Sequence, residues 1–460
     1  MTAPQTGLGQ TKLVQIKLGQ TEPVRTELVR AGLVRAIGRW SLAALAVNSV
    51  IGSGIFGLPS TVAGYLGKRS TVAVLVAGAA MAVIMACFAE VASQFSEAGG
   101  PYLYARRAFG RLTGILVGWT LYLSQTAAPA ANANLFVIYL AEFWPRAKEP
   151  WPRFLILTLL VWVLAFVNAR GARQGAVVSN VFAIAKILPL LMVVSAGAAL
   201  TLFHPAAWNG AATFPGSAWM KAIFLLIFAY GGFESALAPT GEARNPARDT
   251  AFALLVTLIS CTAIYALVQW VVVGVLGPGA TSDRPLAEVA RVTMGNRGAG
   301  LVAIGALVSV YGYVSAKLLG MPRVTFALAE GGDLPGIFGA VSRRFHTPWF
   351  SILVYATVVW GLALAGSFAW NVTLAVVARL FYYGVVCAAL IPLRLKASAR
   401  EEPRTTGFRL PGGPVWAVLG VLITLTLATQ ADLSKSIILG VTVAAAVLNW
   451  LWARRVSRPE

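Results

Sequence analysis

The sequence predicts an all-α polytopic membrane protein, and three observations carry this prediction. Of the 460 residues, 58% are hydrophobic and only 12% are charged, whereas a soluble protein would carry about a quarter charged residues. Runs of about 20 apolar residues, the length of a membrane-spanning helix, recur from Trp40 to Trp452. Polar helical faces do not recur often enough to meet water, which argues against a large soluble core.

Twelve apolar runs are expected to be transmembrane helices. They cover residues 40–65, 70–95, 112–142, 154–169, 176–203, 219–241, 250–277, 299–330, 348–365, 369–396, 414–430 and 434–454. Most of the 37 Lys and Arg residues fall in the tails and loops that this count places on one side of the bilayer. Because cytoplasmic loops collect basic residues, both termini are predicted to be cytoplasmic.

The spans divide the chain into three parts. Residues 1–36 form a basic N-terminal tail without the apolar core of a signal peptide; a helix on the membrane surface and an unstructured tail are both open. Residues 37–396 form a ten-span core, and residues 397–460 hold an inner loop, the last two spans and a short C-terminus. Within the core, segment 100–111 is expected to lie as a helix along the inner surface, and segment 282–298 to cover the outer face.

Composition also bears on cofactors and partners. The net charge is +20, but the Lys and Arg residues lie mostly in the connections between the apolar runs, where cytoplasmic loops collect them. The charge is therefore not a sign of nucleic acid binding. Cys87, Cys261 and Cys387 all lie inside apolar segments, which argues against disulfides and metal clusters. The sequence contains no GxxxxGK[ST] motif for a nucleotide. No cofactor, metal or enzymatic activity is predicted, and the oligomeric state is not assigned.

The first span carries the segment VNSVIGSGIFGLPS, which places helix-disfavouring residues at its centre. Gly52 lies about 18 Å of helix beyond Trp40, near the middle of a hydrocarbon core about 30 Å thick. Irregular backbone at that depth needs protein or a water-filled cavity beside it. The free carbonyls of such a break suit an ammonium or cation, and the free amides suit a carboxylate, so the pattern favours a zwitterion. Close packing of helices through small residues is the alternative.

The sixth span, KAIFLLIFAYGGFESALAPTGEARNP, contains a second interruption at Gly231 and Gly232. Gly52 and Gly232 are each followed by a proline roughly two turns later, Pro59 and Pro239. Interrupted segments at corresponding places in two halves of a chain point to a transporter binding site.

These motifs resemble those of the amino acid–polyamine–organocation superfamily of permeases. GSGIF in the first span, FAYGGFES and GEARNP in the sixth, AGGPYLYARRAFG and MPRVTFALAEGGDLP carry the resemblance, which extends over spans one to ten. It implies two inverted five-helix repeats with broken helices 1 and 6, plus two peripheral helices. It also implies a secondary transporter that moves amino acids by alternating access. Compact loops and the lack of targeting segments suggest a bacterial inner membrane.

The resemblance also implies a substrate site at the two breaks. Beside Gly52, the backbone amides that would hold the substrate carboxylate are those of Ser53, Gly54 and Ile55. The carbonyls that would receive its α-amine are those of Ile51, Phe228, Ala229 and Gly231. The Phe228 ring occupies the place of an aromatic that caps the substrate in relatives, with plain packing as the alternative.

Two ionisable residues at membrane depth are candidates for proton coupling or gating. The resemblance implies that Lys186, deep in the fifth span, fills the position of a sodium ion and bridges helices five and one. Proton coupling without sodium follows, with a fixed brace as the alternative. Glu234 matches an acid linked to proton sensing and gating in relatives, with a purely structural hydrogen-bonded glutamate as the alternative.

Further polar residues are assigned less sharply. Arg379 lies deep in the tenth span, and its candidate partners are Glu234 and Glu90. The residues that could face the pocket are Gln125, Tyr311, Tyr313 and Ser315. The residues expected to end the sixth helix at the inner face are Glu242, Asn245 and Arg248.

Several functions other than uptake of amino acids stay open. The chain could exchange an amino acid for an amine, or carry polyamines or nucleobases, for which Glu234 would supply the acid. A channel would need a pore-lining repeat or a charged ring, and a receptor would usually need a soluble signalling domain; neither pattern occurs. The lack of a further obvious acid favours neutral over cationic amino acids.

Overall fold

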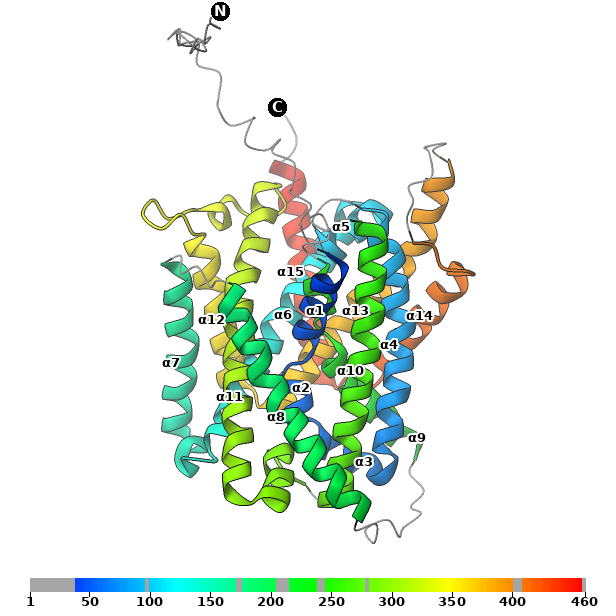
Figure 1. Ribbon diagram of the computed structural model, residues 1–460. Coiled ribbons are helices and arrows are strands. Elements are labelled where there is room, and N and C mark those ends of the chain that lie inside the picture. Colours follow the sequence, from blue (N-terminus) through cyan, green and yellow to red (C-terminus); the bar gives the residue numbers. More distant parts are fainter. Residues whose placement is uncertain are drawn as a thin grey trace, which may run out of the picture.

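The computed structural model describes residues 38–95, 99–170, 176–203, 215–237, 245–277, 281–399 and 408–456. Within these ranges the chain forms helices and no strand. Most helices run up and down through one bundle, as Figure 1 shows. The start of α1, the end of α15 and the short helix α5 lie at the same end of this bundle, whereas α3 lies at the other.

The helices follow the apolar runs of the sequence closely. The first run is divided among three helices, and the sixth ends in a short 3₁₀ helix, η4. The main elements are α1 (Arg39–Val50), α2 (Ser53–Gly57), α3 (Pro59–Leu66), α4 (Ser70–Ser93), α5 (Gly100–Phe109), α6 (Arg111–Leu140), α7 (Pro150–Ala169), α8 (Ala176–Phe203), α9 (Gly216–Tyr230), η4 (Phe233–Ala236), α10 (Pro246–Leu276), α11 (Pro285–Glu330), η6 (Gly336–Gly339), α12 (Trp349–Ala365), α13 (Phe368–Ala399), α14 (Gly413–Ala428) and α15 (Leu433–Val456).

Seven helical segments of the described chain are long and apolar enough to cross a membrane. Four shorter apolar helices accompany them. The long helix α6 belongs to neither group, and it carries several buried polar side chains. The described part of the protein is all-helical, and its long apolar helices fit a polytopic membrane protein. The count of twelve spans and the inverted repeats stay predictions.

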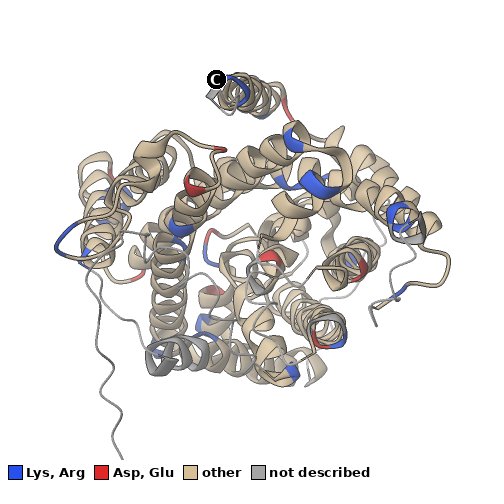
Figure 2. Cartoon of the chain, turned by 90° about the horizontal axis from the view of Figure 1, so that it is seen from above, with Lys and Arg blue, Asp and Glu red and all other residues tan. Residues whose placement is uncertain are grey.

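The helices differ greatly in how much the bundle covers them. Within their most apolar windows, 72% of the Phe368–Lys396 segment is buried, but only 11% of the Leu433–Arg455 segment. In the view along the helix axes, α15 stands at the edge of the bundle beside the mark for the C-terminus (Figure 2). Helix α13 is therefore a central element, whereas α15 is peripheral.

Both loop helices expected from the sequence are present. Helix α5 covers most of segment 100–111, and residues 285–294 of segment 282–298 form the first part of α11. Gly295, with φ of 71°, interrupts the helical backbone of α11 and separates this part from the long run behind it. A glycine tolerates this left-handed conformation at no steric cost, so the kink falls where the sequence provides one.

The expected end of the sixth helix was wrong in part. Asn245 and Arg248 were expected there, but Asn245 is the N-cap of α10 and Arg248 lies in the first turn of that helix. Pro246, between them, favours the first helical turn because its missing N–H has no intrahelical partner there. Glu242 and the N-terminal tail, residues 1–36, lie outside the described residues.

Candidate functional site

The first run of the chain is interrupted after Val50. Ile51 has φ and ψ of −68° and 96°, Gly52 has −133° and −150°, and α2 begins at Ser53. The side chains around the break are shielded from solvent, with Ile51 and Ser53 each 1% exposed. The first amides of α2 have no partner within the helix, as at every helix start. The non-helical residues are therefore Ile51 and Gly52, and the amides of Ser53, Gly54 and Ile55 stand at the start of α2.

The second break follows α9, which ends at Tyr230. Gly231 is extended, and Gly232 has φ of 118°, a conformation that favours glycine. A side chain at Gly232 would also run into the carbonyl oxygen of Ser49 on α1. A methyl group at Gly54 would lie 2.7 Å from the Cα of Ala229. The two interruptions therefore lie side by side, and their glycines also serve close packing.

Lys186 joins α8 to the end of α1. Its Nζ donates hydrogen bonds to the carbonyl oxygens of Asn48, at 2.6 Å, and Ile51, at 3.0 Å. These carbonyls belong to the last turn of α1 and to the break, where the helix dipole favours a cation. The side chain thus bridges the fifth and first apolar runs.

Glu234 is held by donors from two elements. Its Oε1 accepts hydrogen bonds from the hydroxyls of Tyr382 and Tyr383, each at 2.6 Å. Its Oε2 accepts one from the backbone amide of Gly232, at 2.7 Å. Arg379 Nε lies 3.8 Å from Oε1. The carboxylate therefore ties the second break to α13.

Arg379 inserts from α13 into the second break. It is 1% exposed, and its NH1 donates a hydrogen bond to the carbonyl of Phe228 at 3.0 Å. The guanidinium carbon also lies 5.5 Å from the centre of the Phe228 ring. Of the two candidate partners, Glu234 is the one that lies beside Arg379. Glu90 instead forms two contacts with Arg394, at 2.5 and 2.6 Å.

Three of the carbonyls expected to bind the α-amine already accept a hydrogen bond from a side chain. Lys186 donates to Ile51, Arg379 to Phe228, and the hydroxyl of Tyr265 to Ala229 at 2.9 Å. Each carbonyl oxygen has a second lone pair, so a substrate amine would share these acceptors with the protein.

A cavity of about 1110 Å³ leads to the breaks from the end of the bundle that holds α5. Its wall includes Asn48 and Ser49 beside the first break, Lys186, and Glu234 beside the second. Near the mouth it includes Tyr102, Arg106, Asp333 and Asn449.

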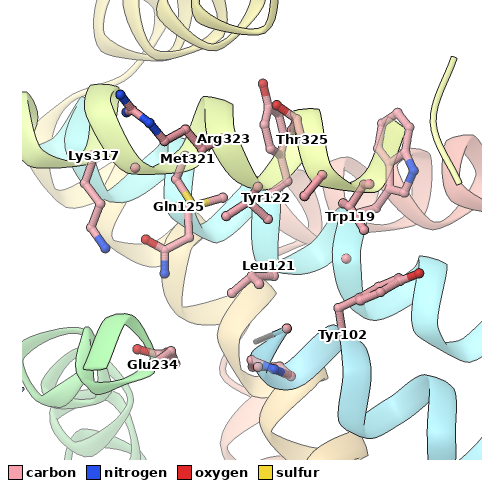
Figure 3. Close-up of a pocket in the computed structure, with 18 of the residues that line it drawn as sticks. Tyr102, Trp119, Leu121, Tyr122, Gln125, Glu234, Lys317, Met321, Arg323 and Thr325 are labelled. Carbon is pink, nitrogen blue, oxygen red and sulfur yellow. The ribbon is translucent and has the colours of Figure 1, made fainter. Parts of the chain in front are cut away.

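Residues on the cavity wall point toward Glu234 from above. Figure 3 shows the side chains of Gln125 and Lys317 reaching toward it from α6 and α11. Tyr313 also lines the cavity, but Tyr311 and Ser315 are not among its lining residues. Two of the four expected pocket residues are therefore on the wall.

The expected carboxylate site lies beyond the deep end of this cavity. Gly54 and Ile55 border a separate void of only about 20 Å³. Phe228 packs edge-on against Phe368, with ring centres 6.5 Å apart, and is not among the residues lining the large cavity. The substrate roles of the amides and of Phe228 stay predictions.

Besides Arg379 Nε, which lies 3.8 Å from Glu234, three buried polar oxygens around the breaks have no hydrogen-bond partner within the described residues. They are Asn48 Oδ1, Ser53 Oγ and Gln125 Oε1. Buried polar groups are nearly always satisfied, so a cluster of exceptions calls for an explanation. A polar ligand or ordered water at the deep end of the cavity would satisfy them.

Sequence reasoning missed the tyrosines that hold Glu234 and Ala229. Tyr382 and Tyr383 follow Arg379 in the run ARLFYYG, where polar aromatics beside a deep arginine were a usable signal. Tyr265 lies in the seventh apolar run with no local pattern to mark it. Sequence reasoning also assigned no role to Lys317, although a lysine at membrane depth signals function by default.

Comparison with known proteins places this sequence in a family. A sequence model described as "Amino acid permease" matches residues 37–451. The branched-chain amino acid permease BcaP of Bacillus subtilis is 28% identical over 85% of this chain and 87% of its own length.

Two further relatives carry other names. The methylthioribose transporter of the same organism is 27% identical over 84% of this chain and 86% of its own. The arginine/agmatine antiporter of Chlamydia pneumoniae is 25% identical over 85% of this chain and 84% of its own. The chain is thus a multi-pass membrane transporter and not an enzyme, and it belongs to the amino acid permease family of the amino acid–polyamine–organocation superfamily.

Proposed function

We propose that this protein is a secondary active transporter that moves amino acids across a membrane by alternating access, coupled to protons and independent of sodium. The observation that carries the proposal is the pair of helix breaks at Gly52 and Gly231–Gly232, which lie side by side at the deep end of a large cavity. Paired breaks supply both amides and carbonyls at membrane depth, which suits the two charged ends of an amino acid.

The proposal includes the topology that the sequence predicts. Twelve transmembrane helices would form two inverted five-helix repeats and two peripheral helices, in a bacterial inner membrane with both termini cytoplasmic. The cavity opens at the end of the bundle where α1 starts and α15 ends. With cytoplasmic termini, this conformation faces inward, and substrate leaves the breaks through the cavity. The opposite path is closed by packing such as that of Gly54 on Ala229.

Lys186 is the residue that would couple transport to protons. A sodium ion between α8 and α1 would be held by carbonyl oxygens, and Lys186 Nζ already meets those of Asn48 and Ile51. Loss of its proton removes the positive charge from this contact and weakens the link between the two helices. Gain and loss of one proton per cycle would therefore favour different conformations.

Glu234 is assigned a positioning role in this cycle. Its carboxylate accepts from Tyr382, Tyr383 and the Gly232 amide, so it fixes the second break against α13. A shift of α13 relative to the break would have to exchange these contacts. The residue would thus act in gating through the position of the break.

Uptake by reconstituted protein tests the proposal. Purified protein in liposomes is given a mixture of labelled amino acids under an inward proton gradient, with and without sodium. The variant Lys186→Ala is compared with Lys148→Ala, whose lysine forms an exposed ion pair with Asp283. We expect proton-stimulated, sodium-independent uptake that loses its pH dependence in Lys186→Ala alone.

Four other outcomes would each change one part of the proposal. Uptake that requires sodium would refute the role of Lys186 and leave transport intact. Uptake only after preloading with an amine would replace the proton-coupled cycle by exchange. Transport of polyamines or nucleobases with no amino acid would overturn the proposed substrate, and passive flux that no gradient drives would point to a channel.

A further inference from the structure

The deep end of the cavity holds more positive than negative charge. Lys186 from α8, Lys317 from α11 and Glu234 from η4 line it, and each is less than one-tenth exposed. Arg379 stands directly behind Glu234. Within the described residues, the lining of this end of the cavity therefore contains two lysines and one acid, and that acid is already paired with Arg379.

The single acid is not available to a basic substrate. Glu234 accepts from Tyr382, Tyr383 and the amide of Gly232, and it pairs with Arg379. A second positive charge on a substrate would meet Lys186 and Lys317 on the cavity wall, while the carboxylate of Glu234 is already paired with Arg379. At about 4 Å, repulsion between two like charges costs about 1 kcal/mol in water and about 4 kcal/mol at an effective dielectric of 20.

Lys317 is the basic group whose position suits recognition of an anion. Its Nζ lies 5.4 Å from the centre of the Tyr313 ring, and both side chains line the cavity. Tyr313 in turn faces the first break, because a side-chain carbon at Gly52 would lie 3.6 Å from its ring. A substrate bound at this break would therefore be separated from the ammonium of Lys317 by about the width of the Tyr313 ring.

The mouth of the cavity has the same sign of charge. Arg106 and Arg323 line it, together with one acid, Asp333. Asp333 is already paired with Arg106, at 2.6 Å, and with Arg111, at 2.8 Å. Like charges along the walls of a cavity raise the local concentration of a ligand of opposite charge.

We propose that the preferred substrates are acidic amino acids, and that Lys317 pairs with the side-chain carboxylate. The inference rests on the proposed function and names the substrate class of the same cavity. A zwitterion adds no net charge to this site and a basic amino acid adds to its excess, whereas an acidic amino acid offsets one positive charge. Charge-assisted hydrogen bonds to a buried ammonium are also stronger than neutral ones.

Competition in proteoliposomes tests the substrate class without any variant. Uptake of labelled glutamate is measured against excess unlabelled aspartate, leucine or arginine. Aspartate should inhibit at concentrations about tenfold lower than leucine, and arginine least of all. Leucine inhibiting as well as aspartate would overturn the proposal.

Two substitutions at Lys317 test the residue. Lys317→Gln should raise the KM for glutamate about tenfold and leave that for leucine within about twofold, whereas Lys317→Arg should retain glutamate uptake. Lys148→Gln, at an exposed ion pair, should change neither. Equal changes for glutamate and leucine in Lys317→Gln would show a structural role and refute the pairing.

Failure of this inference differs from failure of the proposed function. Uptake of leucine and arginine with none of glutamate or aspartate would refute the acidic substrate and keep the amino acid transporter. Uptake of succinate but of no amino acid would refute the proposed amino acid function, and with it the acidic amino acid, while leaving the preference for anions. Should Lys317→Gln fail to fold, the competition series alone decides the substrate class.

Discussion

Gly231 and Arg379 occupy adjoining space so closely that a methyl group on the glycine would overlap the guanidinium. The extended backbone at Gly231 lets Arg379 NH1 reach the carbonyl of Phe228 at 3.0 Å and places its Nε 3.8 Å from Glu234. A glycine is therefore required at this break for packing as well as for conformation. The second break is built around a buried guanidinium from another helix.

Gly231→Ala should strongly destabilise the protein and abolish uptake. The methyl group would push Arg379 from its carbonyl and carboxylate, and breaking a buried ion pair costs about 3–5 kcal/mol. The unfolding temperature in detergent and the initial rate of uptake measure the two effects.

The matched control is Gly361→Ala in α12, where an added Cβ meets nothing within 4 Å. Alanine is favoured over glycine in a helix interior by about 1 kcal/mol, so this variant should be at least as stable as the wild type. Equal stability of the two variants would show that Arg379 moves aside at no cost and would refute the packing argument.

The sequence predicted the local features of this site well. Both breaks occur within one residue of the glycines that predicted them, and Lys186 reaches the first break. These features could be predicted because helix-breaking residues and a lysine at membrane depth are each visible within a single segment of the sequence. The two loop helices and the course of the apolar runs were readable for the same reason.

Pairings between distant segments could not be predicted. Glu234 meets Tyr382 and Tyr383 from a helix that begins more than a hundred residues later, and Glu90 meets Arg394 rather than Arg379. Which faces of two helices meet depends on their rotation and packing, and an apolar run without a polar stripe fixes neither. The cavity, formed by six or more elements, was out of reach for the same reason.

Glu90→Ala should cost far more stability than removal of an exposed acid. Its carboxylate pairs with Arg394 and also accepts the backbone amide of Leu410 at 2.9 Å, which joins α4 and α13 to the chain before α14. Removing it leaves the partly buried guanidinium of Arg394 without its carboxylate and the buried amide of Leu410 without an acceptor, at a cost of about 3 kcal/mol. Unfolding in a denaturing detergent, followed by circular dichroism, measures the free energy.

Asp283→Ala is the control for this substitution, because Asp283 pairs with Lys148 while 67% of its side chain is exposed. Exposed ion pairs contribute about 0–1 kcal/mol, so little change is expected. Comparable losses of unfolding free energy in Glu90→Ala and Asp283→Ala would contradict the view that the contacts of Glu90 with Arg394 and Leu410 hold the chain before α14 against the bundle.

Loss of the Tyr102 proton should make the protein less stable at high pH. Its hydroxyl donates to Asp333 on the loop after α11, and burial together with this contact raises the pKa of Tyr102 from 10.0 to about 12. The neutral phenol is thus favoured in the folded state. Its contribution is fully present below about pH 10 and is lost as the pH rises from there toward about 12.

Tyr102→Phe should remove this part of the pH dependence, because phenylalanine has no proton to lose. Unfolding temperatures of wild type and variant, measured from pH 8 to pH 11.5, should converge as the pH rises, since the wild type alone loses the contribution of the neutral phenol. Tyr65→Phe, on α3 at the opposite end of the bundle, serves as the control and should keep the slope of the wild type. Parallel curves for wild type and Tyr102→Phe would show that the phenol does not titrate with unfolding, and Asp333 would then be held by Arg106 and Arg111 alone.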